Sequence, residues 1–304
     1  MINPAIKLRH LQTFVEIARQ RSVLRAAEVL HISQPAVTKT IRELEEALTV
    51  KVLERDGRGI RLTRQGETFL RHATATLTAF RQGIDSVSQD MADAAPLVRI
   101  GALPTVSARI MPRAVNHFLA GEPNVRLKIV TGENGVLLDQ LRAGVLDLVV
   151  GRLADAERMK GFSFEHLYSE RVVLVVRPEH PLLAETAIFP RLGAFPVLVP
   201  TQSAIIRPVV DRFLVTNGID DLPVRIETIS DAFGRVFVSN SDAVWIISEG
   251  VVANDLATGL LERLPVDTQD TRGPVGLTMR ADFAPAWPFT AFMQAIRHAV
   301  DEIA

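Results

Sequence analysis

The sequence contains no cysteine among its 304 residues, and this absence removes several classes of protein. It excludes a disulfide framework and any chemistry that depends on a thiolate, and it fits a reducing compartment. No apolar stretch approaches the ~18 uninterrupted residues of a membrane span. The N-terminus also lacks the apolar core of a signal peptide. We therefore expect a cytoplasmic protein that has no membrane partner.

The sequence motifs of the common enzyme classes are missing as well. The chain has no G-x-S-x-G elbow, no Walker A loop and no H-E-x-x-H pair. Its 7 histidines show no spacing typical of metal ligands. The pair Gly132 and Gly135 is too short a pattern for a dinucleotide fingerprint. We therefore expect no enzyme activity, no cofactor and no metal.

The charges that are present are unevenly distributed. The length suits two or three domains, and the 47% apolar and 23% charged content is that of an ordinary soluble protein. Residues 1–66 contain 12 Lys or Arg and 7 Asp or Glu, whereas the remainder contains 22 and 28, for a net charge of −1. A basic N-terminal segment on an acidic body indicates that only one end meets a polyanion.

The stretch Ser33–Leu48 predicts an amphipathic helix that reads DNA. Ser33 is a good N-cap, and Pro35 falls in the first turn, where its missing N–H costs little. Apolar residues at positions 37, 41, 44 and 48 form one buried face. The opposite face and the N-terminal end would meet the major groove. We predict DNA contacts from Ser33, Gln34, Pro35, Thr38, Lys39 and Arg42. An ordinary surface helix is the alternative for this stretch alone.

The flanking segments favour DNA binding over that alternative. A helix with one apolar face at 11–18 precedes a second helix capped by Ser22, so that residues 23–42 form a helix-turn-helix. Residues 51–62 alternate around Asp56-Gly57, which predicts a β-hairpin wing. Arg55 and Arg58 near its tip would reach phosphates or the minor groove. A solvated charged hairpin is the alternative.

A long helix capped by Thr63 and ending near Asp93 is expected next. Its apolar residues follow a heptad spacing, which favours pairing with a second copy of the chain. The predicted pairing residues are Phe69, Leu77, Phe80, Ile84 and Val87. Packing of this stripe against its own domain is the alternative. Two-fold pairing predicts an operator with inverted half-sites.

From Leu97 onward, short apolar runs alternate with helical patterns, as in α/β domains. The predicted strands are Val98–Gly101, Arg126–Val130, Leu146–Val150, Val172–Val176, Pro196–Val199, Val224–Ile229, Ala243–Ile247 and Val275–Met279. The predicted helices are Val106–Ala120, Asn134–Ala143, Ile205–Asn217, Asp231–Ser239 and Pro288–Ile303.

The N-terminal motifs resemble those of the LysR-type transcriptional regulators. The resemblance rests on Leu8-Arg9-His10-Leu11 with Phe14, Ser22 with Ala26-Ala27, Ser33-Gln34-Pro35-Ala36-Val37-Thr38, Ile41 with Leu44-Glu45, and Leu53-Glu54-Arg55 with Leu62-Thr63 and Gly66. The chain departs from the family pattern at Thr38, where serine is usual. It departs again at Thr49-Val50, which leaves the turn into the wing uncertain.

The resemblance implies a fold and a set of partners. An all-α winged helix-turn-helix domain would span 6–63, a linker helix for dimerisation 64–93 and an effector-binding domain 94–304. The effector domain would be α/β and periplasmic-binding-protein-like, with two Rossmann-like subdomains at 94–167 with 268–304 and at 168–267. The implied partners are double-stranded DNA, a small-molecule inducer, further copies in a homodimer or homotetramer, and RNA polymerase.

Polar residues at the C-terminal ends of the predicted strands suggest where an inducer binds. Helix N-termini and hydroxyl groups suit a carboxylate, and Arg152 or Arg207 would add a bidentate contact. The predicted effector-binding residues are Pro104, Thr105, Ser107, Thr131, Arg152, Thr201, Ser203 and Phe233. Helix capping is the alternative role for each hydroxyl, and an ion pair is the alternative for each arginine.

Longer stretches resemble the branch of the family that activates genes of aromatic-acid breakdown. These stretches are Gln34–Leu44, Gly101–Val106, Val130–Asn134, Gly161–Glu170 and Trp245–Gly250. The resemblance implies an acidic inducer such as protocatechuate or a carboxylated muconate. The galactose-related branch is similar in the body and implies a sugar. A solute-binding protein that does not bind DNA is the alternative from another class.

Overall fold

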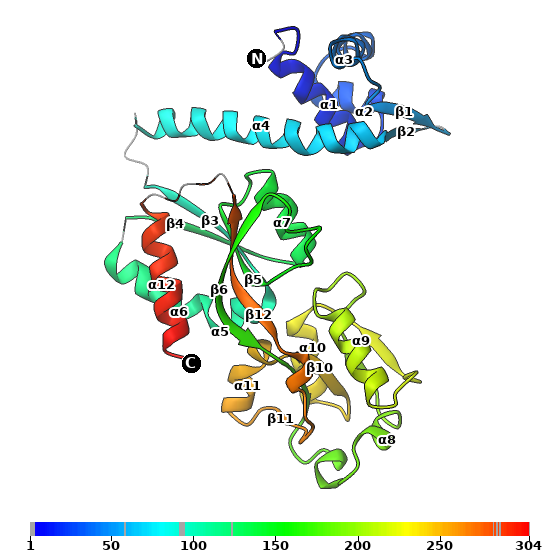
Figure 1. Ribbon diagram of the computed structural model, residues 1–304, viewed down its shortest axis with the longest axis vertical. Helices are drawn as coiled ribbons and strands as arrows, with labels where there is room; N and C mark the ends of the chain where they lie inside the picture. Colours follow the sequence, from blue (N-terminus) through cyan, green and yellow to red (C-terminus); the bar gives the residue numbers. More distant parts are fainter. Residues whose placement is uncertain are drawn as a thin grey trace. The chain divides into compact units, whose positions relative to one another are not determined.

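The computed structural model describes residues 4–57, 59–90, 95–122, 124–281, 283, 285 and 287–303, and in the helix at 64–90 it describes only the backbone at 71, 78, 79, 81, 82 and 85–90 (Figure 1). The chain forms two compact units. The N-terminal unit is Met1–Ala94 with Arg142–Val145, and the C-terminal unit is Ala95–Leu141 with Leu146–Ala304. Within the described ranges, no helix combines the length and apolar character needed to span a membrane.

The N-terminal unit contains the predicted helix-turn-helix and wing. Its elements are α1 (Leu8–Gln20), α2 (Val23–Leu30), α3 (Gln34–Leu48), β1 (Leu53–Asp56), β2 (Gly59–Leu62) and α4 (Arg64–Asp90). The Ser22 hydroxyl accepts from the Arg25 N–H at 3.3 Å, and the Ser33 hydroxyl accepts from the Ala36 N–H at 3.4 Å. Both predicted N-caps are therefore confirmed. A core that includes Phe14 holds the first three helices together.

The turn from α3 into the wing is held by a buried carboxylate. Glu45 is only 8% exposed, and its Oε1 accepts from the backbone N–H groups of Val52 at 3.0 Å and Leu53 at 3.3 Å. Its Oε2 accepts from Lys51 Nζ at 2.6 Å. Thr49 ends the helix in the left-handed conformation, with φ of 57°. These bonds determine the turn that the Thr49-Val50 sequence left uncertain.

The start of α4 is attached to the wing. The Thr63 hydroxyl accepts from the Gly66 N–H at 3.0 Å, as its predicted role as a cap requires. A Cβ at Gly66 would lie 2.0 Å from the Val52 carbonyl oxygen, so only glycine allows this approach. The long helix therefore begins in direct contact with the wing.

The apolar stripe of α4 has two different environments. Phe69 and Leu77 pack against the core of their own unit, and the Phe69 ring centroid lies 5.3 Å from that of Phe14. Phe80 and Ile84 are each 51% exposed. The prediction that the whole stripe pairs with a second copy is therefore corrected for Phe69 and Leu77, which contribute to the intramolecular core. The Val87 side chain lies outside the described residues.

The C-terminal unit contains two five-stranded sheets. The first, in subdomain I, has the order β4-β3-β5-β12-β6, and the second, in subdomain II, has the order β11-β7-β10-β8-β9. Subdomain I contains β3 (Leu97–Ala102), α5 (Pro104–Arg109), α6 (Met111–Gly121), β4 (Arg126–Thr131), α7 (Asn134–Arg142), β5 (Leu148–Arg152), β6 (Phe162–Glu170), β12 (Gly273–Arg280) and α12 (Phe289–Asp301). Subdomain II contains β7 (Val172–Val176), η1 (Pro181–Ala184), α8 (Phe189–Leu192), β8 (Val197–Val199), α9 (Arg207–Thr216), β9 (Arg225–Glu227), α10 (Asp231–Ser239), β10 (Val244–Ser248), η2 (Glu249–Val251), α11 (Ala253–Ala257) and β11 (Glu262–Arg263), and η3 (Gln269–Thr271) precedes β12.

Helices cover both faces of the first sheet. Apolar residues of α6 and α12 pack with Ile100 and Val150 on one face, and those of α7 pack with Val149 on the other (Figure 1). Strands β3, β4 and β5 are parallel, whereas β12 is antiparallel to both β5 and β6. The parallel strands point their carboxyl ends at one edge, where open α/β sheets bind ligands.

Two crossings join the subdomains. The chain leaves the first sheet after Glu170 and enters the second at Val172, and it returns to the first sheet at Gly273, which pairs with Glu170. The crossings therefore lie a few residues beyond the positions 168 and 267 that the family resemblance implied. All the predicted strands are present with small shifts at their ends, but the prediction omitted β6 and β11.

Candidate DNA-binding surface and effector cavity

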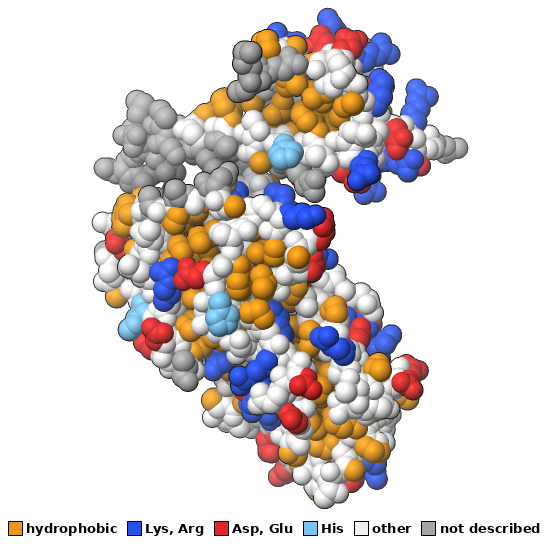
Figure 2. Space-filling view, viewed as in Figure 1, with side chains coloured by type: hydrophobic (Ala, Val, Ile, Leu, Met, Phe, Trp, Pro, Cys, Tyr) orange, Lys and Arg blue, Asp and Glu red, His pale blue; other side chains and the backbone are white. Residues whose placement is uncertain are grey.

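The outer face of α3 carries the side chains predicted to read DNA. Gln34, Lys39 and Arg42 are exposed, while Val37 and Leu44 on the opposite face are fully buried. Figure 2 shows Lys and Arg side chains gathered on the part of the N-terminal unit that bears α3 and the wing. The helix therefore offers amide and cationic donors on a single solvent-facing side.

The remaining predicted DNA contacts have different surroundings. The Thr38 hydroxyl is half-buried and donates to the Gln34 carbonyl at 3.0 Å. Ser33 and Pro35 are exposed at the N-terminus of α3. Arg55 is exposed on β1, and Arg58 lies outside the described residues. The wing therefore presents at least one exposed cation beside the helix.

An ion-pair cluster fixes the orientation of α3 on α1. Glu43 Oε2 lies 2.9 Å from Arg9 Nη2 and 3.2 Å from His10 Nε2. These contacts, that of His10 foremost, hold the pKa of the Glu43 carboxyl below its usual range. The sequence predicted neither this cluster nor the Glu45 contacts, because both depend on residues from other elements.

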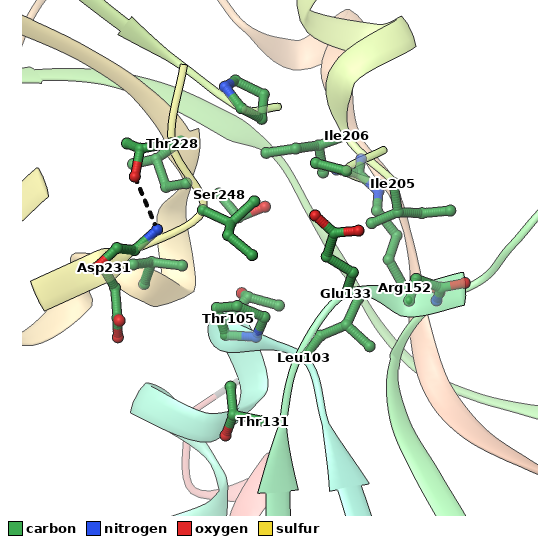
Figure 3. Close-up of a pocket in the computed structure, with 18 of the residues that line it drawn as sticks. Leu103, Thr105, Thr131, Glu133, Arg152, Ile205, Ile206, Thr228, Asp231 and Ser248 are labelled. Atoms are coloured by element: carbon green, nitrogen blue, oxygen red, sulfur yellow. Dashed lines mark hydrogen bonds between the residues drawn. The ribbon is translucent and has the colours of Figure 1, made fainter. Parts of the chain in front are cut away.

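A cavity of about 300 Å³ lies between the two subdomains of the C-terminal unit, at the carboxyl ends of the parallel strands (Figure 3). Most of its wall is apolar, from Leu103, Pro104, Pro200, Ala204, Ile205, Ile206, Ile229, Trp245, Ile247 and Val251. Polar groups come from Thr105, Thr131, Glu133, Asn134, Arg152, Thr228, Ser230, Asp231 and Ser248. An apolar pocket with a few polar groups is the usual design of a small-molecule site.

Arg152 places a buried cation in the cavity wall. The side chain is 6% exposed, and its Nη2 donates to the backbone carbonyls of Glu170, at 3.2 Å, and Thr271. Those carbonyls belong to the two chain segments that cross between the subdomains. Its Nη1 is buried and has no hydrogen-bond partner among the described residues. Burial lowers the pKa of the guanidinium, so an anion beside it would relieve the cost of desolvation.

Glu170 joins the two subdomains beside this arginine. The carboxyl is 3% exposed, and it accepts from the Thr105 hydroxyl at 2.5 Å and from the Gly250 N–H at 2.8 Å. Thr105 belongs to subdomain I and Gly250 to subdomain II. Burial raises the pKa of the Glu170 carboxyl, while its hydrogen bonds and Arg152 act in the opposite direction.

A second carboxylate joins the subdomains across the cavity. Glu133 follows β4, and its Oε1 accepts from the Ser203 hydroxyl at 2.7 Å and from the Thr201 hydroxyl at 3.4 Å. In Figure 3 its carboxylate points into the cavity, between Leu103 and Ile206. A carboxyl group of the protein itself therefore accepts from two hydroxyls that the sequence predicts to bind the inducer.

The structure places half of the predicted effector-binding residues in the cavity wall. Pro104, Thr105, Thr131 and Arg152 line the cavity, but Ser107, Thr201, Ser203 and Phe233 do not. The Ser107 hydroxyl is paired with that of Thr131 at 3.0 Å, and those of Thr201 and Ser203 face Glu133. Phe233 is 45% exposed and stacks on Phe237.

Arg207 has a structural role that replaces the expected ligand contact. Its side chain is buried, with Nε 2.7 Å from Asp211 Oδ1 and Nη1 3.0 Å from Glu227 Oε1. Nη1 also donates to the Pro200 carbonyl at 2.8 Å. The guanidinium therefore fixes the start of α9, and it is not part of the cavity wall.

Comparisons with known proteins agree with this division of the chain. The family model described as a bacterial regulatory helix-turn-helix protein of the lysR family matches residues 8–67, and the LysR substrate binding domain matches residues 92–301. The chain is 64% identical over 304 residues to the HTH-type transcriptional regulator PcaQ of Agrobacterium fabrum. The aligned region covers 100% of this chain and 98% of that protein. It is 35% identical to the uncharacterised HTH-type transcriptional regulator YdcI of Escherichia coli, over 99% of this chain and 98% of that protein.

Solved structures agree on the fold. Full-length CbnR in complex with its target DNA superposes with a TM-score of 0.64 at 22% identity, covering 97% of this chain and 100% of that chain. The arrangement of a winged helix-turn-helix, a long helix and two α/β subdomains is therefore one that known full-length proteins share.

Proposed function

The chain belongs to the LysR family of bacterial transcriptional regulators, and from that membership we propose that a small carboxylic acid from aromatic breakdown is its inducer. As a family member it binds DNA through its helix-turn-helix unit, binds a small molecule through its C-terminal unit and forms oligomers. The two relatives compared above both carry the name of a transcriptional regulator, and neither is named as an enzyme.

The buried cation of Arg152 is the observation that supports an acidic inducer. Its Nη1 has no hydrogen-bond partner within the part of the chain that the structure describes, and Arg152 belongs to the wall of a largely apolar cavity. A carboxylate is the simplest ligand that satisfies such a donor and offsets its charge. The volume of about 300 Å³ lies at the lower end of ligand pockets, which suits a single-ring acid. The resemblance to the aromatic-acid branch of the family leads to the same class of compound.

A thermal-shift screen tests the class of inducer directly. The full-length protein is heated with protocatechuate, with carboxylated muconates and with galactose as the neutral comparison. We expect the acids to raise the melting temperature, because a ligand that binds only the native state stabilises it. Stabilisation by the sugar and by none of the acids would overturn the proposal and favour a sugar-responsive regulator.

Replacing Glu133 by glutamine is expected to tighten the binding of the acid at least fivefold. The Glu133 carboxylate points into the same cavity, and two like charges ~4 Å apart oppose one another by about 1 kcal/mol even in water. Calorimetric titration of the full-length variant measures the change. Glu157→Gln is the matched control, because Glu157 is exposed and pairs with Lys160 outside the cavity. Unchanged or weaker binding to Glu133→Gln would show that Glu133 does not repel the carboxylate of the ligand.

We also propose that α3 reads base edges and that the wing contacts the backbone. Gln34 would meet a base edge, Thr38 a base or phosphate, and the cations Lys39, Arg42 and Arg55 phosphates or bases. Arg58, which lies outside the described residues, would also reach phosphates or the minor groove. The support is the exposure of Gln34, Lys39, Arg42 and Arg55 on the N-terminal unit. Phe80 and Ile84 are the exposed apolar residues of α4 that would pair two copies on inverted half-sites.

Gln34→Ala is expected to reduce discrimination between the operator and a mismatched site at least fivefold. A glutamine that pairs with adenine in the major groove contributes about 1–3 kcal/mol of discrimination. Fluorescence anisotropy with both DNAs measures the ratio of affinities at a fixed salt concentration. Gln65→Ala is the control, because Gln65 is also an exposed glutamine, but it lies on α4 and not on α3. Unchanged discrimination in Gln34→Ala would refute this role.

The inducer would act by closing the cavity between the subdomains. Arg152 would then join the ligand to the two crossing segments whose carbonyls it already binds. The linker helices of paired copies would rotate and alter the spacing of the wings on DNA. A ligand shifts such an equilibrium only by its differential affinity for the two states. Footprinting at saturating inducer tests this mechanism, and an unchanged footprint and DNA bend would contradict it.

A further inference from the structure

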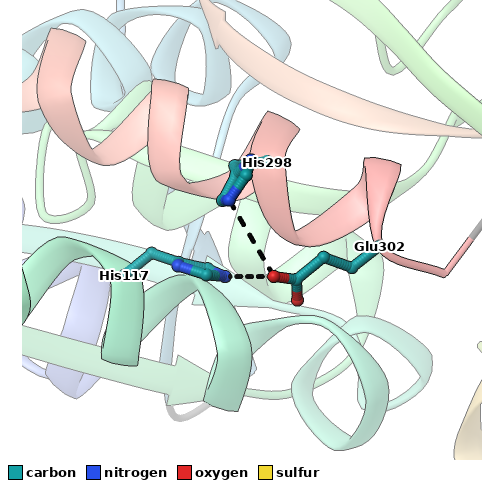
Figure 4. Close-up of side chains that lie close together, drawn as sticks. All are labelled: His117, His298 and Glu302. Atoms are coloured by element: carbon teal, nitrogen blue, oxygen red, sulfur yellow. Dashed lines mark ion pairs between the residues drawn. The ribbon is translucent and has the colours of Figure 1, made fainter.

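Two histidines and a glutamate form a cluster on the surface of subdomain I, away from the residues that line the cavity (Figure 4). His117 lies on α6, His298 lies on α12, and Glu302 caps the C-terminus of α12. Glu302 Oε1 is 2.9 Å from His117 Nε2 and 3.9 Å from His298 Nε2. We propose that this cluster binds a divalent transition-metal ion, with Zn²⁺ as the reference ion.

The two helices that carry the histidines are packed against each other beneath the cluster. Phe118 and Phe292 from the same two helices are buried, with ring centroids 5.2 Å apart. Ala114, Ile296 and Ala299 are also buried in this core. The imidazole rings of His117 and His298 touch edge to face, with centroids 4.4 Å apart. Adjacent, well-packed helices therefore present both rings to one carboxylate.

The separations of the three donor atoms suit a metal ion. All three lie within 4.8 Å of one another. Nitrogen and oxygen ligands sit about 2.0–2.2 Å from Zn²⁺, so that the donors of a tetrahedral site are roughly 3.3–3.6 Å apart. Small side-chain rotations would bring the three donor atoms, now within 4.8 Å of one another, to the separations of a tetrahedral site. Within the residues that the structure describes, no other three His, Asp or Glu side chains meet this condition.

The donor set selects the class of metal. Two imidazoles and one carboxylate suit Zn²⁺, Ni²⁺, Co²⁺ or Cu²⁺, whereas Mg²⁺ and Ca²⁺ prefer sites made only of oxygen atoms. Three protein ligands leave the fourth position of a tetrahedral site open to water. The site would therefore bind a transition metal in the presence of Mg²⁺.

The electrostatic surroundings also favour a cation. The cluster lies at the C-terminus of α12, where the last backbone carbonyls carry partial negative charge. Arg297, the neighbour of His298 in the sequence, is bound to Glu165 by two hydrogen bonds of 2.7 and 2.9 Å. That guanidinium is therefore held by β6 and does not neutralise Glu302.

The test is a titration of the full-length protein, purified without a polyhistidine tag. We expect Zn²⁺ to bind with one ion per chain in calorimetry and to raise the melting temperature, with 1 mM Mg²⁺ present throughout as a competitor. We expect Co²⁺ to give visible absorption bands typical of nitrogen and oxygen ligands. Failure of Zn²⁺ to bind in this titration would overturn the proposal.

Single substitutions then locate the ion. His117→Ala, His298→Ala and Glu302→Gln are each expected to weaken Zn²⁺ binding at least tenfold, since loss of even a residue that only supports a metal ligand costs about 10–100-fold. His166→Ala is the matched control, because His166 is an exposed histidine on β6 outside the cluster. Melting curves without metal show whether each variant is folded. Binding that survives in all three variants, or that is lost in His166→Ala, would place the ion elsewhere and overturn the proposal.

Discussion

Arg152→Met is expected to lower the affinity for the acidic inducer by roughly 10- to 150-fold while leaving operator binding without inducer intact. A hydrogen bond to a charged group contributes about 1.5–3 kcal/mol, and here Nη1, which has no partner among the described residues, would donate to the carboxylate of the ligand. Methionine keeps an unbranched side chain of similar length in the buried position. Calorimetric titration with the acid that performs best in the thermal-shift screen measures the loss.

Two comparisons make this result specific. Lys128→Met removes an exposed cation from β4 of the same subdomain, and it is expected to leave the affinity unchanged. Arg152→Lys keeps the charge but loses the second donor group, so its affinity should fall between those of the wild type and Arg152→Met. If Arg152→Met bound the acid as tightly as the wild-type protein, the buried cation would not be the anion receptor.

The second large effect is expected at the junction between α3 and the wing. Glu45→Ala removes the acceptor for the Val52 and Leu53 N–H groups and leaves Lys51 without its partner. A buried donor without a partner costs about 1–3 kcal/mol, so the N-terminal unit should lose at least about 2 kcal/mol of unfolding free energy. Hydrogen exchange measured by mass spectrometry should show faster exchange over residues 51–62. Operator affinity should fall with it.

Glu46→Ala is the control for this experiment. Glu46 is the next residue of the same helix, it is exposed, and its side chain makes none of the bonds that Glu45 makes to the wing. Both variants lose one negative charge, so any difference between them comes from the contacts of Glu45. Equal exchange rates over residues 51–62 in the two variants would show that Glu45 does not hold the wing.

The sequence predicts the DNA-binding unit well because its signals are local. The Ser22 and Ser33 caps lie next to the helices they begin, and the buried faces repeat within a few turns. Glu45 was missed although it follows Ile41 by one helical turn and so falls on the buried face. Its partners come from the wing, and spacing within one helix does not reveal them.

The candidate ligand sites are predictable only in part, because they depend on distant residues. The carboxyl ends of the parallel strands correctly indicate the region of the cavity. The bond between Glu133 and Ser203, by contrast, joins residues from different subdomains. In the same way, His117 and His298 are far apart in the sequence and meet only because α6 packs on α12. Histidine spacing along the chain therefore gave no indication of a metal site.

The helix α4 shows a limit of periodicity itself. Phe69 and Phe80 belong to the same heptad pattern, yet Phe69 contacts Phe14 and Phe80 is half exposed. A repeat predicts that a stripe is covered, but it does not say whether its own domain or a second copy covers it. The prediction of dimerisation therefore now depends on the exposed half of the helix.

The contact between Phe69 and Phe14 has a mechanical consequence. Because Phe69 at the start of α4 packs in the core that also contains residues of α1 and α3, these helices share one set of apolar contacts. If α4 rotates when the inducer binds, as proposed above, these contacts would pass the rotation to α3. We therefore expect that a glycine inserted after Leu77, next to these core contacts, weakens the effect of the inducer on DNA binding, and titration of operator DNA with and without inducer measures the change.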